Sequence, residues 1–158
     1  TYQKFTAKRT HLSCQHTINA TSSVVFPLLC PIREFDWIEK WDCELLYSKS
    51  GFAELGCIFT THNEADGGLD TWLISQYDTN KHIQFIRMNS LRATRYDLTL
   101  TENGNKTDIL WQQEITAVCE LGNSLVESIN PVDFDQQIKM LEQLLNHYIK
   151  DGTCMLMS

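Results

Sequence analysis

The clearest pattern in this chain is an alternation of apolar and polar residues that begins after Trp41 and continues to Cys119. A period of two places every second side chain on the same face of a strand, so the pattern predicts strands that bury one face. Asn103-Gly104 and the polar segment 78–81 interrupt the alternation with residues that favour tight hairpin turns. The predicted strands cover residues 43–47, 55–61, 71–77, 83–88, 91–101 and 107–119.

The pattern then changes to a helical period, which predicts a long amphipathic helix over residues 131–150. Asn130 and Pro131 are typical of a helix start, and Gly152 is typical of a helix end. At 1.5 Å per residue this helix is roughly 30 Å long, and it needs an apolar surface on which to pack. Its apolar stripe consists of Phe134, Ile138, Leu141, Leu145 and Tyr148.

The first part of the chain predicts one strand and two short helices. Residues 5–16 are rich in Thr and in apolar or aromatic residues, as strands are. A short helix through residues 25–29 follows, with Pro27 and Pro31 limiting its length. A second short helix or turn covers residues 32–38. Because no linker, repeat or low-complexity segment divides the chain, residues 1–158 are predicted to form a single domain.

This order of elements predicts an α+β fold, in which a curved antiparallel sheet of about seven strands is covered by the long C-terminal helix. The order resembles the helix-grip fold of the START/Bet v 1-like superfamily, also called SRPBCC, over nearly the whole chain. The segment from Phe26 to Ile38, followed by Trp41 to Leu45, is similar to an uncharacterised bacterial branch of that superfamily. The superfamily includes lipid carriers, hormone receptors, cyclases and chaperone activators. The resemblance therefore implies a fold but no single function.

The resemblance implies a ligand cavity between the concave face of the sheet and the long helix. Trp37 and Trp41 lie near the expected mouth of this cavity, whereas Trp72 and Trp111 lie in strands. All four can instead belong to the core, because large aromatic residues dominate any core. The first two are the better cavity candidates, since two tryptophans so close together at a helix–strand junction are difficult to bury equally. The other aromatic and aliphatic residues assigned to the cavity are Phe59, Phe85, Tyr96 and Leu141.

Charged residues are candidates for orienting a ligand inside the cavity. Arg87 shares its strand face with apolar residues, where it requires an anionic ligand or a carboxylate partner. Glu114 is one candidate for that partner. Arg33 and Glu34 either form a solvated pair or send one side chain into the pocket, where Arg can bind a carboxylate or phosphate. Arg87, Tyr96 or Glu114 would then fix the orientation of the ligand.

Composition excludes several classes of function. The formal net charge of -7 argues against nucleic acid as a partner, and no run of eighteen apolar residues could span a membrane. The polar residues 1–10 do not look like a signal peptide. No two of the six cysteines form a CxxC pair, which favours free thiols in a reducing, cytoplasmic environment.

Motifs for catalysis and for cofactors are absent from the sequence. His62 and Glu64 could offer two metal ligands, but no third ligand follows at local spacing, so no metal and no cofactor are expected. There is no G-x-S-x-G elbow and no phosphate-binding loop. We therefore predict a monomer or weak homodimer that binds or transports a small hydrophobic or amphipathic molecule, such as a lipid or polyketide. The alternatives are a polyketide cyclase or aromatase-like enzyme and a chaperone-activator-like interaction module.

Overall fold

The structure is a computed structural model that describes residues 4–156. Its strands are β1 (Arg9–Ile18), β2 (Glu44–Tyr47), β3 (Ile58–Asn63), β4 (Gly68–Asp78), β5 (His82–Met88), β6 (Arg92–Asn103) and β7 (Lys106–Ala117). All seven form one antiparallel sheet in the order β1-β7-β6-β5-β4-β3-β2. Consecutive hairpins account for the neighbours from β2 to β7, and β1 closes the other edge by pairing with β7.

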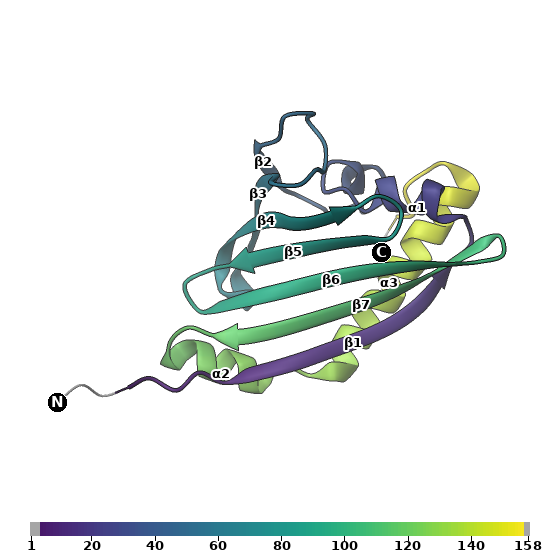
Figure 1. The fold of residues 1–158 in the computed structure, drawn as a ribbon. Coiled ribbons are helices and arrows are strands. Elements are labelled where there is room, and N and C mark those ends of the chain that lie inside the picture. Colours follow the sequence, from purple (N-terminus) through teal and green to yellow (C-terminus); the bar gives the residue numbers. More distant parts are fainter. Residues whose placement is uncertain (1–3, 157–158) are drawn as a thin grey trace.

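The helices lie at the ends and on one face of this sheet. Helix α3 lies across the face of the sheet that β6, β7 and β1 form (Figure 1). This arrangement confirms the predicted α+β helix-grip fold, with two short helical segments after the first strand and a long helix at the end. The helical elements are α1 (Ser22–Leu28), the 3₁₀ turns η1 (Arg33–Asp36) and η2 (Glu64–Asp66), α2 (Glu120–Ser128) and α3 (Pro131–Asp151).

Both predicted ends of α3 are confirmed, and local chemistry explains them. The side chain of Asn130 accepts a hydrogen bond from the backbone N–H of Val132 at 2.9 Å, which satisfies one of the free donors at the helix start. Gly152 ends the helix in the left-handed conformation with φ 71°, where its N–H donates to the carbonyl of Tyr148 at 2.7 Å. The Asn130-Pro131 and Gly152 signals therefore mark the two ends of the helix.

The buried stripe of α3 differs in part from the predicted one. Phe134, Ile138 and Leu145 are buried as expected, and Leu144 is buried as well. Leu141 and Tyr148 are only half-buried. Leu141 keeps exposed surface because it faces a cavity rather than the filled part of the core.

Several predicted strand ends were wrong. Strand β3 begins at Ile58 rather than residue 55, because residues 55 and 56 form a turn, and β4 begins at Gly68 rather than residue 71. The first strand begins at Arg9 rather than residue 5, and the last strand ends at Ala117 rather than Cys119. The start of β1 and the end of β7 lie opposite each other, because the two strands pair from Arg9 opposite Thr116 to Ile18 opposite Thr107. Residues beyond the paired length have no neighbouring strand to complete a ladder.

Helix α2 was not predicted at all. Its sequence contains Gly122, Asn123 and two serines, all of which are poor helix formers. Packing stabilises it instead, because Val126 is buried and the side chain of Asn123 accepts from the backbone N–H of Lys8 at 2.8 Å. A Cβ atom at position 122 would lie 1.9 Å from the carbonyl oxygen of Leu91, so only glycine permits this close approach.

Side chains of α3 also join the helix to the end of β1. The carboxylate of Glu142 accepts a hydrogen bond from the backbone N–H of Thr17 at 3.0 Å. The side-chain oxygen of Asn146 accepts from the backbone N–H of Asn19 at 2.8 Å. The backbone at this corner of the sheet is therefore satisfied by the helix rather than by another strand.

Candidate ligand-binding cavity

A cavity of about 460 Å³ lies between the concave face of the sheet and α3. Alternate residues of β3 to β7 form its floor, Gln137 and Leu141 of α3 form one wall, and residues between Pro31 and Asp42 form another. The period of two explains the floor, since every second strand residue faces the same side. The volume is within the range of roughly 300–1,000 Å³ that is typical of small-molecule sites.

Aromatic rings dominate the apolar part of the cavity. Phe59 and Trp72 stack with their ring centroids 5.3 Å apart and their planes 16° from parallel. Phe85 meets both rings edge-on, at centroid distances of 6.1 Å from Phe59 and 5.6 Å from Trp72. These contacts fix the rings in place, so the apolar surface is already formed in the absence of a ligand.

The two tryptophans near the predicted mouth both line the cavity, but they are buried to different degrees. Trp37 is 1% exposed, and its indole N–H donates to the carbonyl of Leu28 at 2.8 Å. Trp41 is half-buried and donates to the carbonyl of Pro31 at 2.8 Å. The strand tryptophans, Trp72 and Trp111, line the cavity too.

Arg87 points inward, and its partners are two aspartates that the sequence analysis did not identify. Its guanidinium lies 3.0 Å from a carboxylate oxygen of Asp66 and 3.9 Å from one of Asp70. It also lies over the ring of Trp72, 4.7 Å from the ring centroid, in cation–π geometry. Burial and the neighbouring charge of Arg92 lower the pKa of Arg87.

Arg92 completes a compact ionic cluster at this end of the cavity. It is 1% exposed and binds Asp70 through two hydrogen bonds of 2.7 and 2.8 Å. Two further hydrogen bonds, of 2.6 and 3.2 Å, join it to the carboxylate of Asp66. We call Asp66, Asp70, Arg87 and Arg92 the ionic cluster. With two arginines and two aspartates, it carries no net charge.

The predicted pairing of Arg87 with Glu114 was wrong. Glu114 lies on the outer face of the sheet, where it binds His11 at 3.1 Å, Arg95 at 3.3 Å and Arg9 at 3.5 Å. The period of two along β7 explains this position, because the residues on either side of Glu114 face inward. Glu114 therefore does not take part in the cavity.

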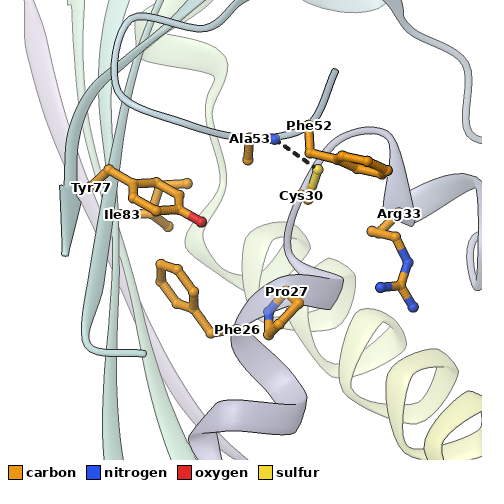
Figure 2. A pocket seen from close by; sticks show the side chains of 8 residues that line it. All are labelled: Phe26, Pro27, Cys30, Arg33, Phe52, Ala53, Tyr77 and Ile83. Carbon is orange, nitrogen blue, oxygen red and sulfur yellow. Dashed lines mark hydrogen bonds between the residues drawn. The ribbon is translucent and has the colours of Figure 1, made fainter. Parts of the chain in front are cut away.

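Arg33 also lies outside the main cavity. It borders a second pocket of about 250 Å³, shown in Figure 2, and its side chain binds Asp36 at 2.9 Å. In the same pocket the sulfur of Cys30 accepts a hydrogen bond from the backbone N–H of Ala53 at 3.2 Å. Arg33 thus fits the expectation of a solvated pair on a short helix, although its partner is Asp36 rather than Glu34.

Glu34, the neighbour of Arg33, lines the main cavity instead. Burial raises the pKa of Glu34 well above its ordinary value. Tyr96 faces the same space, and burial raises the pKa of its phenol above the usual range. The sequence left open whether Arg33 or Glu34 enters the pocket or whether both face solvent. The direction of a side chain on a short 3₁₀ turn has no periodic signal that would decide this.

Histidine and cysteine side chains do not form a metal site in the part of the chain that the structure describes. His62 lies at the rim of the cavity, 3.0 Å from Glu64, and more than half of its side chain is exposed. All six cysteines lie within residues 4–156, and each is a free thiol. In the same range, no helix is both long and apolar enough to cross a bilayer.

Neither a scan of protein-family models nor a search of curated proteins gives a match to the chain. Solved structures do match. Ginseng major latex-like protein 151 from Panax ginseng has a TM-score of 0.65 at 13% identity, over 89% of this chain and 97% of that chain. The aromatase/cyclase Zhui from Streptomyces sp. R1128 has a TM-score of 0.65 at 10% identity, over 94% and 100% of the two chains.

A third similar structure is DynU16, a protein of the dynemicin biosynthetic locus, with a TM-score of 0.61 at 12% identity. The match covers 90% of this chain but 48% of DynU16, so the chain spans about half the length of that protein. Identities this low establish the fold alone. The chain has the same helix-grip fold as these structures.

Proposed function

We propose that this protein binds a small hydrophobic or amphipathic molecule in the cavity between the sheet and α3. The observation that carries the proposal is the cavity itself, which combines preformed aromatic walls with a few polar groups. Such a composition is typical of small-molecule sites, where apolar surface supplies affinity and polar groups supply orientation. The aromatase/cyclase Zhui has the same fold, and its name indicates that it acts on a small molecule, which supports the proposal by analogy of fold.

A pair of substitutions on α3 tests this proposal. Leu141→Trp places a large side chain in the cavity, whereas Met140→Trp places the same side chain on the exposed surface of the same helix. The neutral dye N-phenyl-1-naphthylamine, whose fluorescence rises in apolar sites, is the probe. We expect the parent and Met140→Trp to bind the dye and Leu141→Trp to lose most of the binding. Equal binding by both variants, or no binding by the parent, would contradict the proposal.

An enzymatic role is the second candidate, and Glu34 is the observation that favours it. A carboxyl group with a raised pKa inside a cavity is typical of residues that transfer protons in catalysis. A cyclase or aromatase-like reaction would use the same cavity to fold a reactive chain and Glu34 to move a proton. Turnover of a poly-β-ketone substrate that disappears in Glu34→Gln would support this candidate over simple binding.

The outer face of the sheet offers an observation in favour of protein interaction. Tyr47, Leu69 and Met88 are each more than half exposed there, and Leu73 is 39% exposed. Exposed apolar residues that lie together on one face are characteristic of contact surfaces. A chaperone-activator-like role would use this face and leave the cavity unused, so the dye experiment separates the two functions.

The setting of the protein is also a proposal. The net charge of -7 and the six cysteines support a cytoplasmic location and a partner other than nucleic acid. We propose a monomer or weak homodimer that works without a cofactor. The similarity of segments 26–38 and 41–45 to a bacterial branch of the superfamily supports a bacterial source.

A further inference from the structure

Two buried polar atoms on the lining of the main cavity have no hydrogen-bond partner in the part of the chain that the structure describes. They are Nε of Arg87 and Nε1 of Trp111, and both are N–H donors. The other tryptophans of the cavity differ, because Trp37, Trp41 and Trp72 each donate to a protein oxygen at 2.8 Å. A buried donor without an acceptor is costly unless a ligand or water supplies one. The spare hydrogen-bonding capacity of the cavity therefore suits an acceptor.

The ionic cluster uses only part of the hydrogen-bonding capacity of Arg87. Arg92 makes two hydrogen bonds to each carboxylate of the cluster, at distances between 2.6 and 3.2 Å. Among residues 4–156, the guanidinium of Arg87 makes one hydrogen bond, from Nη2 to Asp66 at 3.0 Å. Its approach of 3.9 Å to Asp70 is too long for another. Arg87 is therefore a charged donor whose Nε–H the cluster leaves unused.

The position of Arg87 brings it within reach of a ligand. It pairs with Trp72 on β4 and with Thr94 on β6. It lines both the main cavity and a third pocket, of about 280 Å³, which lies between η2 and the junction of α2 and α3. The carbon of its guanidinium is 4.7 Å from the ring centroid of Trp72. A ligand that contacts the aromatic rings of the cavity therefore lies beside this donor.

The charges around the cavity permit a neutral or an anionic acceptor at Arg87 but disfavour a cation. The ionic cluster has no net charge, and the other acidic and basic residues of the lining are Glu34, Lys40, Asp42 and His62. Lys40, Asp42 and His62 are exposed, so water screens their charges. A cationic group beside the Nε–H of Arg87 would be repelled by the guanidinium, whereas an oxygen acceptor would be attracted to it.

We propose that the cavity recognises an oxygen acceptor on its ligand, a carbonyl or a carboxylate, through the Nε–H of Arg87. This inference rests on the proposed function and adds to it the chemical group that is recognised. The apolar remainder of the ligand packs against the rings of Phe59, Trp72 and Phe85. Arg87 thus has two roles, because its Nη2 holds Asp66 while its Nε selects the ligand.

Three probes with the same ring system and two variants test the inference. The probes are 2-acetylnaphthalene with a carbonyl, 2-naphthoate with a carboxylate, and 2-ethylnaphthalene with no acceptor. Arg87→Lys replaces the Nε–H with a methylene group but keeps a positive charge for Asp66. Arg95→Lys makes the same change on the outer face of the sheet and is the matched control. Dissociation constants are measured by NMR titration of the labelled protein.

The quantity compared is the dissociation constant of each acceptor probe divided by that of 2-ethylnaphthalene, since the change in this ratio between parent and variant cancels differences in hydrophobicity. We expect the ratio for the ketone to rise about 10-fold in Arg87→Lys, the usual effect of one hydrogen bond from a charged donor. It should stay unchanged in Arg95→Lys. The ratio for 2-naphthoate should rise less, because lysine still attracts a carboxylate. The acceptor probe that binds the parent more tightly distinguishes a carbonyl ligand from a carboxylate ligand.

The Nε–Hε signal of Arg87 in the parent gives a second readout that needs no variant. Once it is assigned by triple-resonance NMR, we expect the Hε signal to move downfield on addition of 2-acetylnaphthalene or 2-naphthoate. The move should be absent with 2-ethylnaphthalene, which carries the same ring and so controls for ring currents. If Arg87→Lys does not fold, this shift alone decides the outcome.

The outcomes separate this inference from the proposed function. A change of less than about 2-fold in the ratios of both acceptor probes in Arg87→Lys would overturn the inference and leave the proposed function intact. A downfield shift confined to the indole N–H of Trp111 would also overturn it, because that donor would then bind the ligand. Failure of all three probes to bind the parent would overturn the proposed function itself.

Discussion

The ionic cluster allows a quantitative prediction about stability. Arg92→Met keeps much of the apolar stem of the side chain but removes the charge and its hydrogen bonds. Within residues 4–156, Asp70, whose side chain is 2% exposed, then has only Arg87 at 3.9 Å as a cation, and Asp66 must share that same arginine. Breaking a buried ion pair from one side typically costs about 3–5 kcal/mol, because a charge remains buried without compensation.

The matched control is Arg95→Met on the same strand. Arg95 lies on the opposite face, 53% exposed, and binds Glu114 at 3.3 Å. An exposed ion pair of this kind contributes less than about 1 kcal/mol. Urea denaturation followed by circular dichroism measures both variants. With a slope of about 2 kcal/mol per molar urea, Arg92→Met should lower the midpoint by roughly 1.5–2.5 M.

A double variant tests the reason for the loss. Arg92→Met combined with Asp70→Leu removes one arginine and one aspartate, which leaves Arg87 paired with Asp66 at 3.0 Å. Because no uncompensated charge remains, the double variant should recover most of the stability that Arg92→Met loses. The reasoning is refuted if Arg92→Met loses no more stability than Arg95→Met, or if the double variant is less stable than Arg92→Met alone.

Three further predictions concern the core, pH and the thiols. Ile138→Ala should lower the free energy of unfolding by about 2–5 kcal/mol, whereas the exposed Met140→Ala should change it by less than about 0.5 kcal/mol in the same urea assay. Burial lowers the pKa of His16, with Glu142 opposing the shift, so protonation favours the unfolded state. Stability should therefore fall as the pH drops below about 6.5, and His16→Gln should flatten that dependence in thermal melts. Dithiothreitol should leave the melting temperature unchanged if all cysteines are free thiols; a drop of several degrees would indicate a disulfide.

Most of the fold was predictable because its signals are local. Alternation of apolar and polar residues assigned the strands, Asn103-Gly104 marked a hairpin, and Asn130 and Gly152 marked the ends of α3. Helix α2 was not predictable in this way, because it depends on contacts with residues far away in the sequence. Only the three-dimensional structure shows that position 122 lies against the carbonyl of Leu91.

The candidate site was predictable where the strand period applies. The same period that places Trp72, Phe85 and Arg87 on the concave face also excludes Glu114, and the pairing with Glu114 was wrong because it ignored this rule. Asp70 shares the concave face with Trp72 by the same period, and it was missed because the predicted strand began at residue 71. Asp66 could not be found in the sequence, since it lies on the irregular turn η2. The same applies to Glu34, whose direction depends on how a short 3₁₀ turn docks on the sheet.

The bonds between α3 and β1 have a consequence for synthesis on the ribosome. Glu142 and Asn146 bind the backbone of Thr17 and Asn19 across sequence separations of 125 and 127 residues. The sheet can therefore form before the helix that covers it has been translated, and during that interval its concave aromatic face is open to water and to other chains. Contacts this distant form late and slow the completion of folding. A nascent chain of this protein depends on the prompt arrival of its last helix to avoid aggregation.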